Sequence, residues 1–320
     1  MIVIKNRAEI TPKMQGAAVA IGNFDGMHRG HEALLAQLQR EAKTRQSAAG
    51  VLTFEPHPRK VFRPEGETFR LTLSAAKRRR LAQCGVDFVW EQRFDRPFSQ
   101  RTAAAFIDEL LVDALDVRHV IVGEDFHFGH DRAGDVTFLR AAGERRGFSI
   151  TALAPILAQD GTVYSASRIR ALLQAGDPKG AATLLGRPWD IEGLVVPGDR
   201  RGRDLGFPTA NLELGDHLHP AYGVYAVCVG IANKDRWDWQ NGVANIGRRP
   251  TVSGQVARVE AHLFDFKGDL YGQTIRVALV EFLRPERKFP DLSALKEQIA
   301  QDCKMAQAGF KAYPPPIATL

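Results

Sequence analysis

The first half of the chain alternates short apolar runs with longer amphipathic stretches. The apolar runs have the length of buried strands and cover residues 17–21, 51–54, 86–90, 120–122 and 148–153. The amphipathic stretches predict helices over residues 31–43 and 74–85, from Ser99 onward, and over 135–146. Strands that alternate with helices of this length predict βαβ units and a parallel sheet. Ligands of such sheets bind at the carboxyl ends of the strands.

The pattern changes after about residue 186. Short β-rich runs, separated by Gly, Asn and Asp, cover residues 191–196, 222–229, 243–246, 259–266 and 275–282, and a helical pattern returns at 291–308. This order predicts an antiparallel β-barrel that ends in a helix. We therefore predict two domains: an α/β domain with a Rossmann-like parallel sheet over residues 1–186, and an antiparallel β-barrel domain with a terminal helix over residues 187–320.

The charge distribution does not favour a nucleic-acid-binding protein. The 320 residues carry 43 basic and 37 acidic side chains, a formal charge of +6, and residues 1–186 contribute +5 of it with 26 basic and 21 acidic side chains. The densest basic run, Lys77–Arg80, lies inside a predicted helix, where we expect a solvated face or, failing that, a weak anion-attracting patch. RNA-binding modules interleave basic residues with exposed aromatic ones, and no stretch does so here. We expect small-molecule partners.

Cysteine usage and hydropathy point to an intracellular setting. The three cysteines, Cys84, Cys228 and Cys303, lie far apart in the sequence, which argues against a disulfide framework and a Cys-x-x-Cys metal site. We expect three reduced thiols. No apolar run reaches the roughly 20 residues that a membrane-spanning helix needs, and the N-terminus lacks the layout of a signal peptide. We therefore expect a cytoplasmic protein without a membrane partner.

The segment Ile21–His31 is the most informative for chemistry. It joins the first predicted strand to the first helix, and its glycines at 22, 26 and 30 allow a tight turn close to a ligand. The start of a helix offers N–H groups to phosphate, and His28 and His31 can face the same anion. No GxxxxGK[ST] or GxGxxG pattern occurs, so this is neither a P-loop nor a dinucleotide fingerprint. The alternative is that the glycines only shape a βα turn and the histidines are incidental.

Two later segments return to the same edge of the predicted sheet. Residues 122–129 directly follow the fourth strand, and residues 165–170 precede a helix. Serine hydroxyls at a helix start, with arginines one turn later, suit an anionic ligand. Taken alone, residues 165–170 are more typical of a capped surface helix, so they support a site only together with the histidine segment.

In the second half, residues 193–212 are dense in glycine and arginine, and here a predicted strand leads into a Gly-rich cationic loop. Its backbone N–H groups could wrap a nucleotide phosphate. Thr209 and Asn211 offer oxygen ligands on the same side of an extended backbone, which suits Mg²⁺. An ordinary polar loop explains these residues about equally well. Glu260 lies in an otherwise apolar strand and is either paired with an arginine or used as a base.

The segment Gly22–His31 resembles the HxGH signature of nucleotidyltransferases, and more closely the first domain of the bacterial bifunctional riboflavin kinase/FAD synthetases. The resemblance extends to Thr53–Pro58, to residues 122–129, and to residues 165–170, which match the Ser-Ser-Thr-x-Ile-Arg motif of that family. Ala166 and Ser167 depart from this motif, and Met27 stands where the family has Val. None of these departures removes a charged group.

This resemblance implies that the first domain transfers the adenylyl group of ATP to FMN and releases pyrophosphate. It implies that His28 and His31 are catalytic residues that steady the ATP phosphates, and that Asp125 lies near the adenosine. The other ATP-binding residues that it implies are Gly22, Asn23, Phe24, Gly26, Ser165, Ser167 and Arg168. The flavin-binding residues that it implies are Phe54, His57 and Pro58. Such a transfer asks mainly for positioning and charge neutralisation.

In the second half, Gly206–Asn211 looks like the PTAN motif of riboflavin kinases, and Glu260 follows in that family's order. The resemblance implies that Thr209 and Asn211 hold Mg²⁺ and nucleotide. It places Gly198, Arg203 and Gly206 in the loop around ATP. It implies that the catalytic residue Glu260 accepts the proton of the riboflavin 5′-hydroxyl as that hydroxyl attacks the γ-phosphorus.

Together these motifs imply a bifunctional enzyme of flavin cofactor biosynthesis. It would phosphorylate riboflavin to FMN and then adenylylate FMN to FAD, using one ATP for each step, with Mg²⁺ as cofactor. Two alternatives stay open: only one activity is live, or a flavin- or RNA-binding protein has kept the fold without catalysis. A dead kinase would lack Thr209, Asn211 or Glu260, and all three are present. Only the charge of the first domain favours the binding protein.

Overall fold

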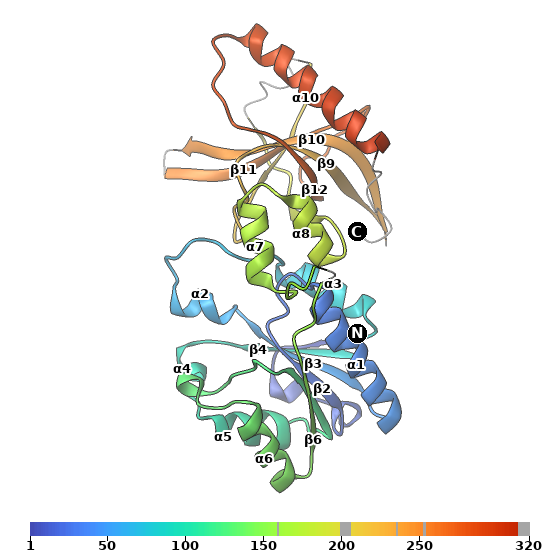
Figure 1. Ribbon diagram of the computed structural model, residues 1–320, viewed down its shortest axis with the longest axis vertical. Helices are drawn as coiled ribbons and strands as arrows, with labels where there is room; N and C mark the ends of the chain where they lie inside the picture. Colours follow the sequence, from blue (N-terminus) through green and yellow to red (C-terminus); the bar gives the residue numbers. More distant parts are fainter. Residues whose placement is uncertain (159, 199–205, 235, 252–253, 313–320) are drawn as a thin grey trace. The chain divides into compact units, whose positions relative to one another are not determined.

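The computed structural model describes residues 1–158, 160–198, 206–234, 236–251 and 254–312. The chain divides into two compact units (Figure 1). The first unit contains Met1–Glu67 and Thr72–Tyr164. The second contains Ser165–Leu320 and the short segment Thr68–Leu71.

The first unit is built on a six-stranded sheet in which every neighbouring pair is parallel, as predicted. The strands are β1 (Ile2–Ile4), β2 (Ala18–Ile21), β3 (Ala49–Glu55), β4 (Phe88–Arg93), β5 (His119–Gly123) and β6 (Ser149–Leu153). Their order is β1-β4-β3-β2-β5-β6, so the chain winds in opposite directions on the two sides of β2. The carboxyl ends of β2 and β5 therefore flank a topological switch point, where open α/β sheets bind ligands.

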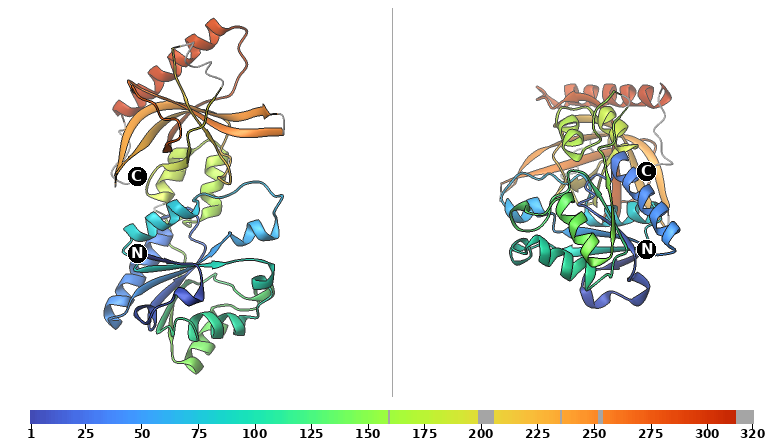
Figure 2. Two further views of the ribbon diagram at one scale, coloured as in Figure 1. Left: turned by 180° about the vertical axis from the view of Figure 1, so that it is seen from behind. Right: turned by 60° about the horizontal axis from the view of Figure 1, so that its bottom comes forward.

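Helices cover both faces of this sheet (Figures 1 and 2). They are α1 (Arg29–Arg45), α2 (Pro58–Phe62), α3 (Ser74–Gln83), α4 (Arg96–Ser99), α5 (Ala103–Phe106), the π-helical turn η3 (Ile107–Val112) and α6 (Val136–Arg146), with short 3₁₀ turns η1 (Arg7–Glu9), η2 (Pro12–Met14) and η4 (His130–Arg132). Apolar residues of α1 and α3 pack on one face and those of α5, η3 and α6 on the other. Burial of both faces explains why the strands are continuous apolar runs.

One predicted helix start is wrong. Ser99 does not begin a helix but is the last residue of α4, whose first turn is capped by Asp95 (Phe98 N to Asp95 Oδ1, 2.9 Å). The next helix begins after Thr102, whose hydroxyl accepts a hydrogen bond from Ala105 N at 3.1 Å. Serine, threonine and aspartate all cap helices, so the sequence offers three candidate starts within eight residues.

The second unit contains a six-stranded antiparallel sheet that curls into a half-barrel, which confirms the predicted class. The strands are β7 (Trp189–Leu194), β8 (Ala210–Glu213), β9 (Gly223–Asn233), β10 (Arg236–Thr251), β11 (Gly254–Leu263) and β12 (Thr274–Pro285), in the order β7-β12-β9-β10-β11-β8. Just beyond β7, Val196 N donates to Asn211 O in β8 at 2.9 Å, so the two edges of the sheet approach each other.

The predicted terminal helix is α10 (Leu292–Ala312), which lies along one face of the half-barrel (Figure 2). Ala306 and Phe310 of this helix join an apolar cluster with Ala226, Cys228 and Val243 of the sheet. All three cysteines have free thiols, and burial raises the pKa of Cys228 to about 12.

Two further helices, α7 (Ala166–Gln174) and α8 (Pro178–Leu185), belong to the second unit together with Thr68–Leu71. This segment is hydrogen-bonded there: Leu218 N donates to Arg70 O and Trp189 Nε1 to Leu71 O, both at 2.8 Å. The domain boundary at residue 186 stays a prediction about which pieces fold independently.

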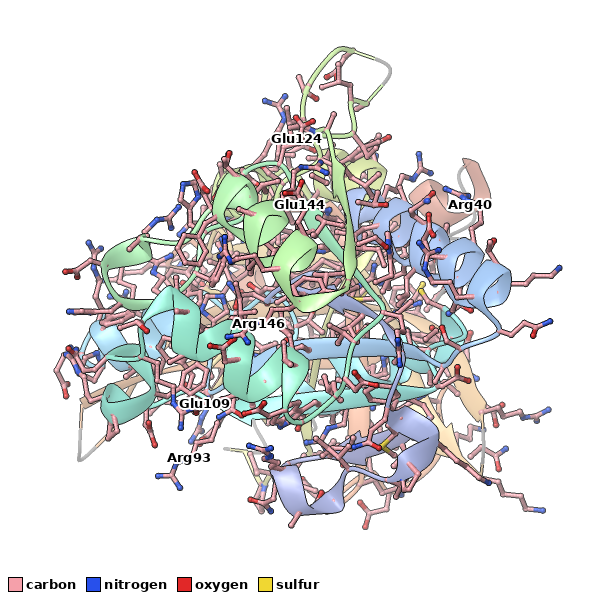
Figure 3. All side chains as sticks on the ribbon, turned by 90° about the horizontal axis from the view of Figure 1, so that it is seen from below. Arg40, Arg93, Glu109, Glu124, Glu144 and Arg146 are labelled. Carbon is pink, nitrogen blue, oxygen red and sulfur yellow. The ribbon has the colours of Figure 1, made fainter. Side chains whose placement is uncertain are left out.

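The basic run Lys77–Arg80 is not the solvated face expected from the sequence, because Lys77 is only 1% exposed. Arg78 pairs with Glu91 at 2.8 Å (Nε to Oε1). Elsewhere on the first unit, charges of both signs lie on the outside, as the labelled side chains of Figure 3 illustrate. Among the helices of the described residues, none combines the length and the apolar character that crossing a membrane requires.

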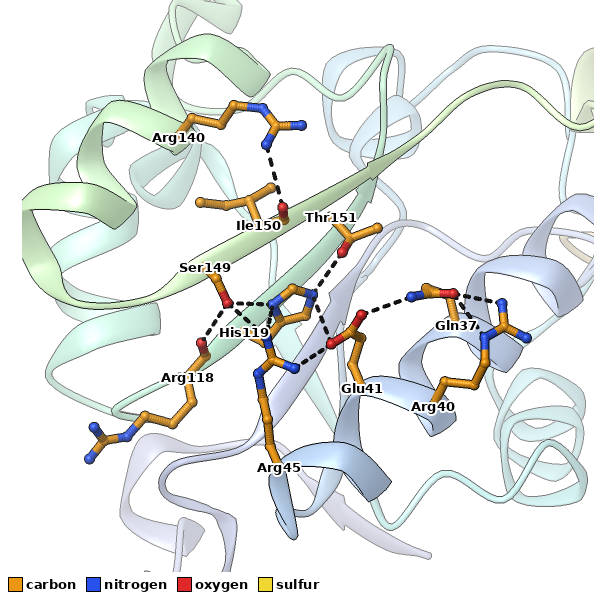
Figure 4. A network of polar contacts seen from close by, with 10 residues as sticks. All are labelled: Gln37, Arg40, Glu41, Arg45, Arg118, His119, Arg140, Ser149, Ile150 and Thr151. Carbon is orange, nitrogen blue, oxygen red and sulfur yellow. Dashed lines mark hydrogen bonds and ion pairs between the residues drawn. The ribbon is translucent and has the colours of Figure 1, made fainter.

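A buried histidine joins the amino-terminal ends of β5 and β6 to α1 (Figure 4). His119 is 3% exposed, and its Nδ1 and Nε2 lie 2.6 and 2.9 Å from the hydroxyls of Ser149 and Thr151. Arg45 Nη2 is 3.2 Å from Nδ1, and Glu41 Oε2 is 3.9 Å from Nε2. Burial lowers the pKa of His119, Arg45 lowers it further, and Glu41 acts in the opposite direction.

Because folding lowers the pKa of His119, it favours the neutral imidazole. This contribution to stability is complete above the unfolded pKa of about 6.5 and is lost as the pH falls towards the folded pKa. We expect the free energy of unfolding of the protein to decrease from about pH 7.5 to about pH 5.5, and to decrease less steeply in His119→Gln, as measured by urea titration. The exposed His130→Gln serves as control, and equal slopes in the wild type and His119→Gln would contradict the assignment.

Candidate active sites

The histidine pair lies at the junction of β2 and α1, as the sequence indicates. His28 is in extended conformation directly before the helix, which begins at Arg29. The rings of His28 and His31 are stacked, with centroids 3.8 Å apart and planes 22° from parallel. The first turn of a helix carries N–H groups without helical partners and the positive end of the helix dipole. Two imidazoles and a helix start thus face the same small region, which suits an anion.

The loop before the pair has an unusual backbone. Phe24 and Met27 have positive φ values of 51° and 46°, and Gly26 has a φ of 86°. Two non-glycine residues in the left-handed region persist only where surrounding contacts hold them. The Phe24 ring is fully buried and lies 5.1 Å from the His31 ring, so this conformation bears directly on the histidine pair.

Thr72 holds this loop from a distant part of the sequence. Its N–H donates to Asp25 Oδ1 at 2.9 Å, and its Oγ1 accepts from Gly26 N at 3.1 Å. Asp25 is 4% exposed, so its carboxylate serves the loop rather than the solvent. Sequence reasoning missed Thr72, which belongs to no motif and lies more than forty residues from its partners.

Lys77 is a second residue that sequence reasoning missed. Its Nζ lies 2.7 Å from Glu55 Oε1 and 3.2 Å from both Thr53 Oγ1 and Asn23 O. Asn23 belongs to the histidine loop, and Glu55 is the last residue of β3. The signal in the sequence pointed the other way, because three arginines follow Lys77 directly.

The remaining predicted residues of the first unit lie at the ends of β2, β3 and β5. Asp125 is exposed just after β5. His57 caps α2, and its Nδ1 accepts from Arg59 N at 3.1 Å, while Pro58 is the first residue of that helix. Phe54 is only 8% exposed, because its ring packs edge-on against Phe94 and lies close to other aromatic rings of the core. Gly22 directly follows β2.

In the second unit, three polar residues form a row across neighbouring strands. Glu260 of β11 is the register partner of Asn211 in β8 and of Asn245 in β10. Directly opposed residues of an antiparallel ladder place their side chains on the same face, so the three side chains share one face. Asn245 Nδ2 donates to Glu286 Oε1 at 3.2 Å. The carboxylate predicted to act as a base therefore lies beside the amide predicted to bind metal.

The PTAN segment is fixed by contacts on both sides. His262 Nδ1 lies 2.9 Å from Pro208 O, and its ring meets Phe207 edge-on. Asn211 is 6% exposed, and a Cβ added to Gly198 would come within 2.7 Å of its amide group, so Gly198 leaves room for this side chain. Sequence reasoning missed the contact of His262 with this segment, although its position two residues after Glu260 places it on the same face of β11.

The other predicted residues are more dispersed, and three of them, Ser165, Ser167 and Arg168, were assigned by the sequence to the site of the first domain. Ser165 caps α7, and its Oγ accepts from Arg168 N at 3.3 Å, while Ser167 and Arg168 are exposed on the first turn. All three belong to the second unit. Gly206 has a φ of 86° and is exposed. Arg203 lies outside the described residues.

The side-chain oxygens of Thr209 and Asn211 fit a hard cation that takes few protein ligands. Asn211 Nδ2 donates to Thr209 O at 3.3 Å, which orients its amide group. In the part of the chain that the structure describes, no three His, Cys, Asp or Glu side chains gather as a metal cluster. Mg²⁺ commonly takes one or two protein oxygens and completes its shell with phosphate and water. Thr209 and Asn211 would supply such oxygens.

Two family models match the chain. The FAD synthetase model covers residues 10–167, and the riboflavin kinase model covers residues 185–310. The bifunctional riboflavin kinase/FMN adenylyltransferase of Escherichia coli K12 is 45% identical over 92% of this chain and 93% of its own length. The protein of that name from Pseudomonas fluorescens is 43% identical over 96% and 97%.

A solved structure has the same fold over nearly the whole chain. It is titled a macrolide-efflux protein from Streptococcus pneumoniae, and it matches with a TM-score of 0.83 and 31% identity over 96% of this chain and 98% of its own. Its title names a different activity from the two family models, and only its fold is carried over to this chain.

Thr72→Val tests the support of the histidine loop. The variant keeps the side-chain shape but leaves the buried Gly26 N–H without its acceptor, which costs about 1–3 kcal/mol. We expect a loss of that size in the free energy of unfolding and faster amide exchange at Gly26. Thr44→Val, at an exposed position of α1, is the matched control. Unchanged exchange at Gly26 would show that Thr72 does not hold the loop.

Proposed function

The chain belongs to the family of bifunctional riboflavin kinase/FMN adenylyltransferases and shares its two activities, and we propose that the second unit phosphorylates riboflavin while the first adenylylates FMN. One observation carries the proposal: each candidate site lies within the residues matched by the family model of the corresponding reaction. The stacked His28 and His31 lie within the residues matched by the FAD synthetase model, and the Asn211–Glu260 row lies within those matched by the riboflavin kinase model.

In the first unit, a phosphate oxygen of FMN attacks the α-phosphorus of ATP, and pyrophosphate leaves. The attacking phosphate is already ionised, so the step needs no protein base. It needs neutralisation of the charge that builds up on the leaving pyrophosphate. His28, His31 and the start of α1 are placed to provide it.

For the adenosine and flavin sides, we propose the roles that the resemblance implies. Asp125 follows β5, and Phe54, His57 and Pro58 lie at and just beyond the end of β3. Both strands are hydrogen-bonded neighbours of β2, so these residues share the sheet edge from which the histidine loop departs. The roles of Ser165, Ser167 and Arg168 stay predictions.

In the second unit, the riboflavin 5′-hydroxyl attacks the γ-phosphorus of ATP, and ADP leaves. A neutral hydroxyl must lose its proton during this step, and Glu260 accepts it. We propose that Thr209 and Asn211 hold Mg²⁺ with the nucleotide; when bound, the ion offsets phosphate charge. Two features support this metal site. Asn211 lies in register beside Glu260, and Thr209 and Asn211 both have side-chain oxygens that can bind the ion.

We also propose that the protein works in the cytoplasm. Its three cysteines have free thiols, and the buried Cys228 and half-buried Cys303 have pKa values raised to about 12 and about 11. Proteins of the reducing cytosol rarely contain disulfides, so three unpaired cysteines favour that compartment.

Reciprocal variants test the assignment of reactions to units. His28→Ala should lower the rate of FAD formation from FMN by at least about 100-fold and leave FMN formation within about twofold of the wild type. Glu260→Gln should do the reverse, because loss of a general base costs about 10²–10⁴-fold in rate. Chromatography of the flavins formed from riboflavin, or from FMN, with ATP and Mg²⁺ measures both.

The controls are His130→Ala, at an exposed histidine of the first unit, and Glu213→Gln, at a carboxylate of β8 that pairs with Arg258 at 3.5 Å. Both should keep both rates. Loss of both activities in His28→Ala would contradict the separation of the sites, and full kinase activity in Glu260→Gln would remove Glu260 from the role of base.

The metal assignment makes a separate prediction. Asn211→Ala should raise the Mg²⁺ concentration for half-maximal FMN formation by about tenfold, the size of one lost ligand interaction. The Mg²⁺ concentration for half-maximal FAD formation should stay unchanged. Asn233→Ala, at an exposed asparagine of β9, is the control. An unchanged Mg²⁺ dependence in Asn211→Ala would exclude Asn211 as a ligand.

A further inference from the structure

In the first unit, one buried ammonium group contacts both the histidine loop and the end of β3. Lys77 of α3 is only 1% exposed. Lysine is almost never fully buried unless its charge is paired. An ammonium group has three N–H donors. Three oxygens receive them here: Glu55 Oε1, Thr53 Oγ1 and Asn23 O. Burial of a cation is costly unless it is paired and hydrogen-bonded, and this set of partners meets that condition.

The contact with Asn23 leads to the histidine pair. Asn23 O belongs to the peptide group that precedes Phe24, the first residue of the loop with a positive φ. Thr53 Oγ1 reaches the same carbonyl at 3.3 Å, so both donors fix this peptide group. The Phe24 ring lies against His31, which is stacked on His28. A shift of the Asn23 carbonyl would therefore move the imidazoles.

The contact with Glu55 concerns charge. Glu55 ends β3 and stands between Phe54 and His57, and its side chain is about one-fifth exposed. An uncompensated carboxylate at this edge would repel the phosphates of ATP. The Lys77 ammonium group lies 2.7 Å away and offsets that charge.

We propose that Lys77 is a positioning residue for FMN adenylylation. It fixes the Asn23 carbonyl, and through it the histidine pair, and it cancels the charge of Glu55 at the edge that receives ATP. It acts through these two residues and does not touch the reacting atoms. The proposal rests on the function proposed for the first unit.

The experiment separates positioning from stability. Lys77→Met removes the ammonium group that lies beside the Glu55 carboxylate, so we compare it with the double variant Lys77→Met/Glu55→Gln, in which both side chains are neutral. The double variant should unfold at nearly the wild-type temperature. Its kcat/KM for ATP in FAD formation should still fall at least about tenfold, with a raised KM, the effect of a lost hydrogen bond to a charged group.

The chain supplies its own internal control, because FMN formation from riboflavin should stay within about twofold of the wild type. Arg80→Met removes a cation from the same helix and should leave both reactions unchanged. Its guanidinium donates to Gln83 Oε1 at 3.2 Å. Thr53→Val keeps the Lys77–Glu55 pair and should raise the KM for ATP by a smaller factor, which tests the proposal even if the Lys77 variants do not fold.

The outcomes distinguish this proposal from the proposed function. If the wild type forms no FAD, the function of the first unit is wrong. If the wild type forms FAD and the folded double variant has unchanged kinetics, Lys77 has only a structural role. If Arg80→Met lowers FAD formation equally, the effect belongs to the charge of α3 and not to Lys77.

Discussion

The first unit depends on one constraint: a polypeptide must turn from a buried strand into a helix, and the polar groups of the turn must all find partners. The loop after β2 lies against the core, with Phe24 and Met27 buried and in left-handed conformation. Buried backbone groups without hydrogen bonds are expensive. Thr72 and Lys77 provide the missing partners from outside the loop. The same contacts that satisfy the buried polar groups of the loop also fix the direction of its two imidazoles.

The second unit solves the corresponding problem with strand pairing. Asn211 lies where β8 pairs with β11 and meets Val196 on its other side, so its backbone is fixed by two neighbours. Its amide group packs against Gly198, and His262 anchors Pro208 a few residues earlier. A residue held in this way keeps its side chain in one orientation before any ligand arrives. Such preorganisation is what phosphoryl transfer requires of a protein.

The sequence was most informative where a pattern is local. The strands and long helices follow from hydropathy, because each buries a face that its own spacing defines. The prediction fails where partners are distant. The strand β8 was read as a loop because its β character comes from pairing with Glu260 and its neighbours in β11. Lys77 was read as surface because only the fold brings Asn23, Thr53 and Glu55 around it.

The two reactions explain why carboxylates have different partners at the two sites. In adenylyl transfer the attacking group is an ionised phosphate, so a carboxylate would add only repulsion. Two acidic side chains around the histidine loop are accordingly occupied: Asp25 accepts from Thr72 N, and Glu55 pairs with Lys77. In riboflavin phosphorylation the attacking group is a neutral alcohol whose proton must go somewhere. There a carboxylate, Glu260, stands in register with the amide of Asn211, on a strand whose neighbours keep it in place. In the proposed assignment, the base of the second unit and the pairing of Asp25 and Glu55 in the first both follow from the protonation state of the two nucleophiles.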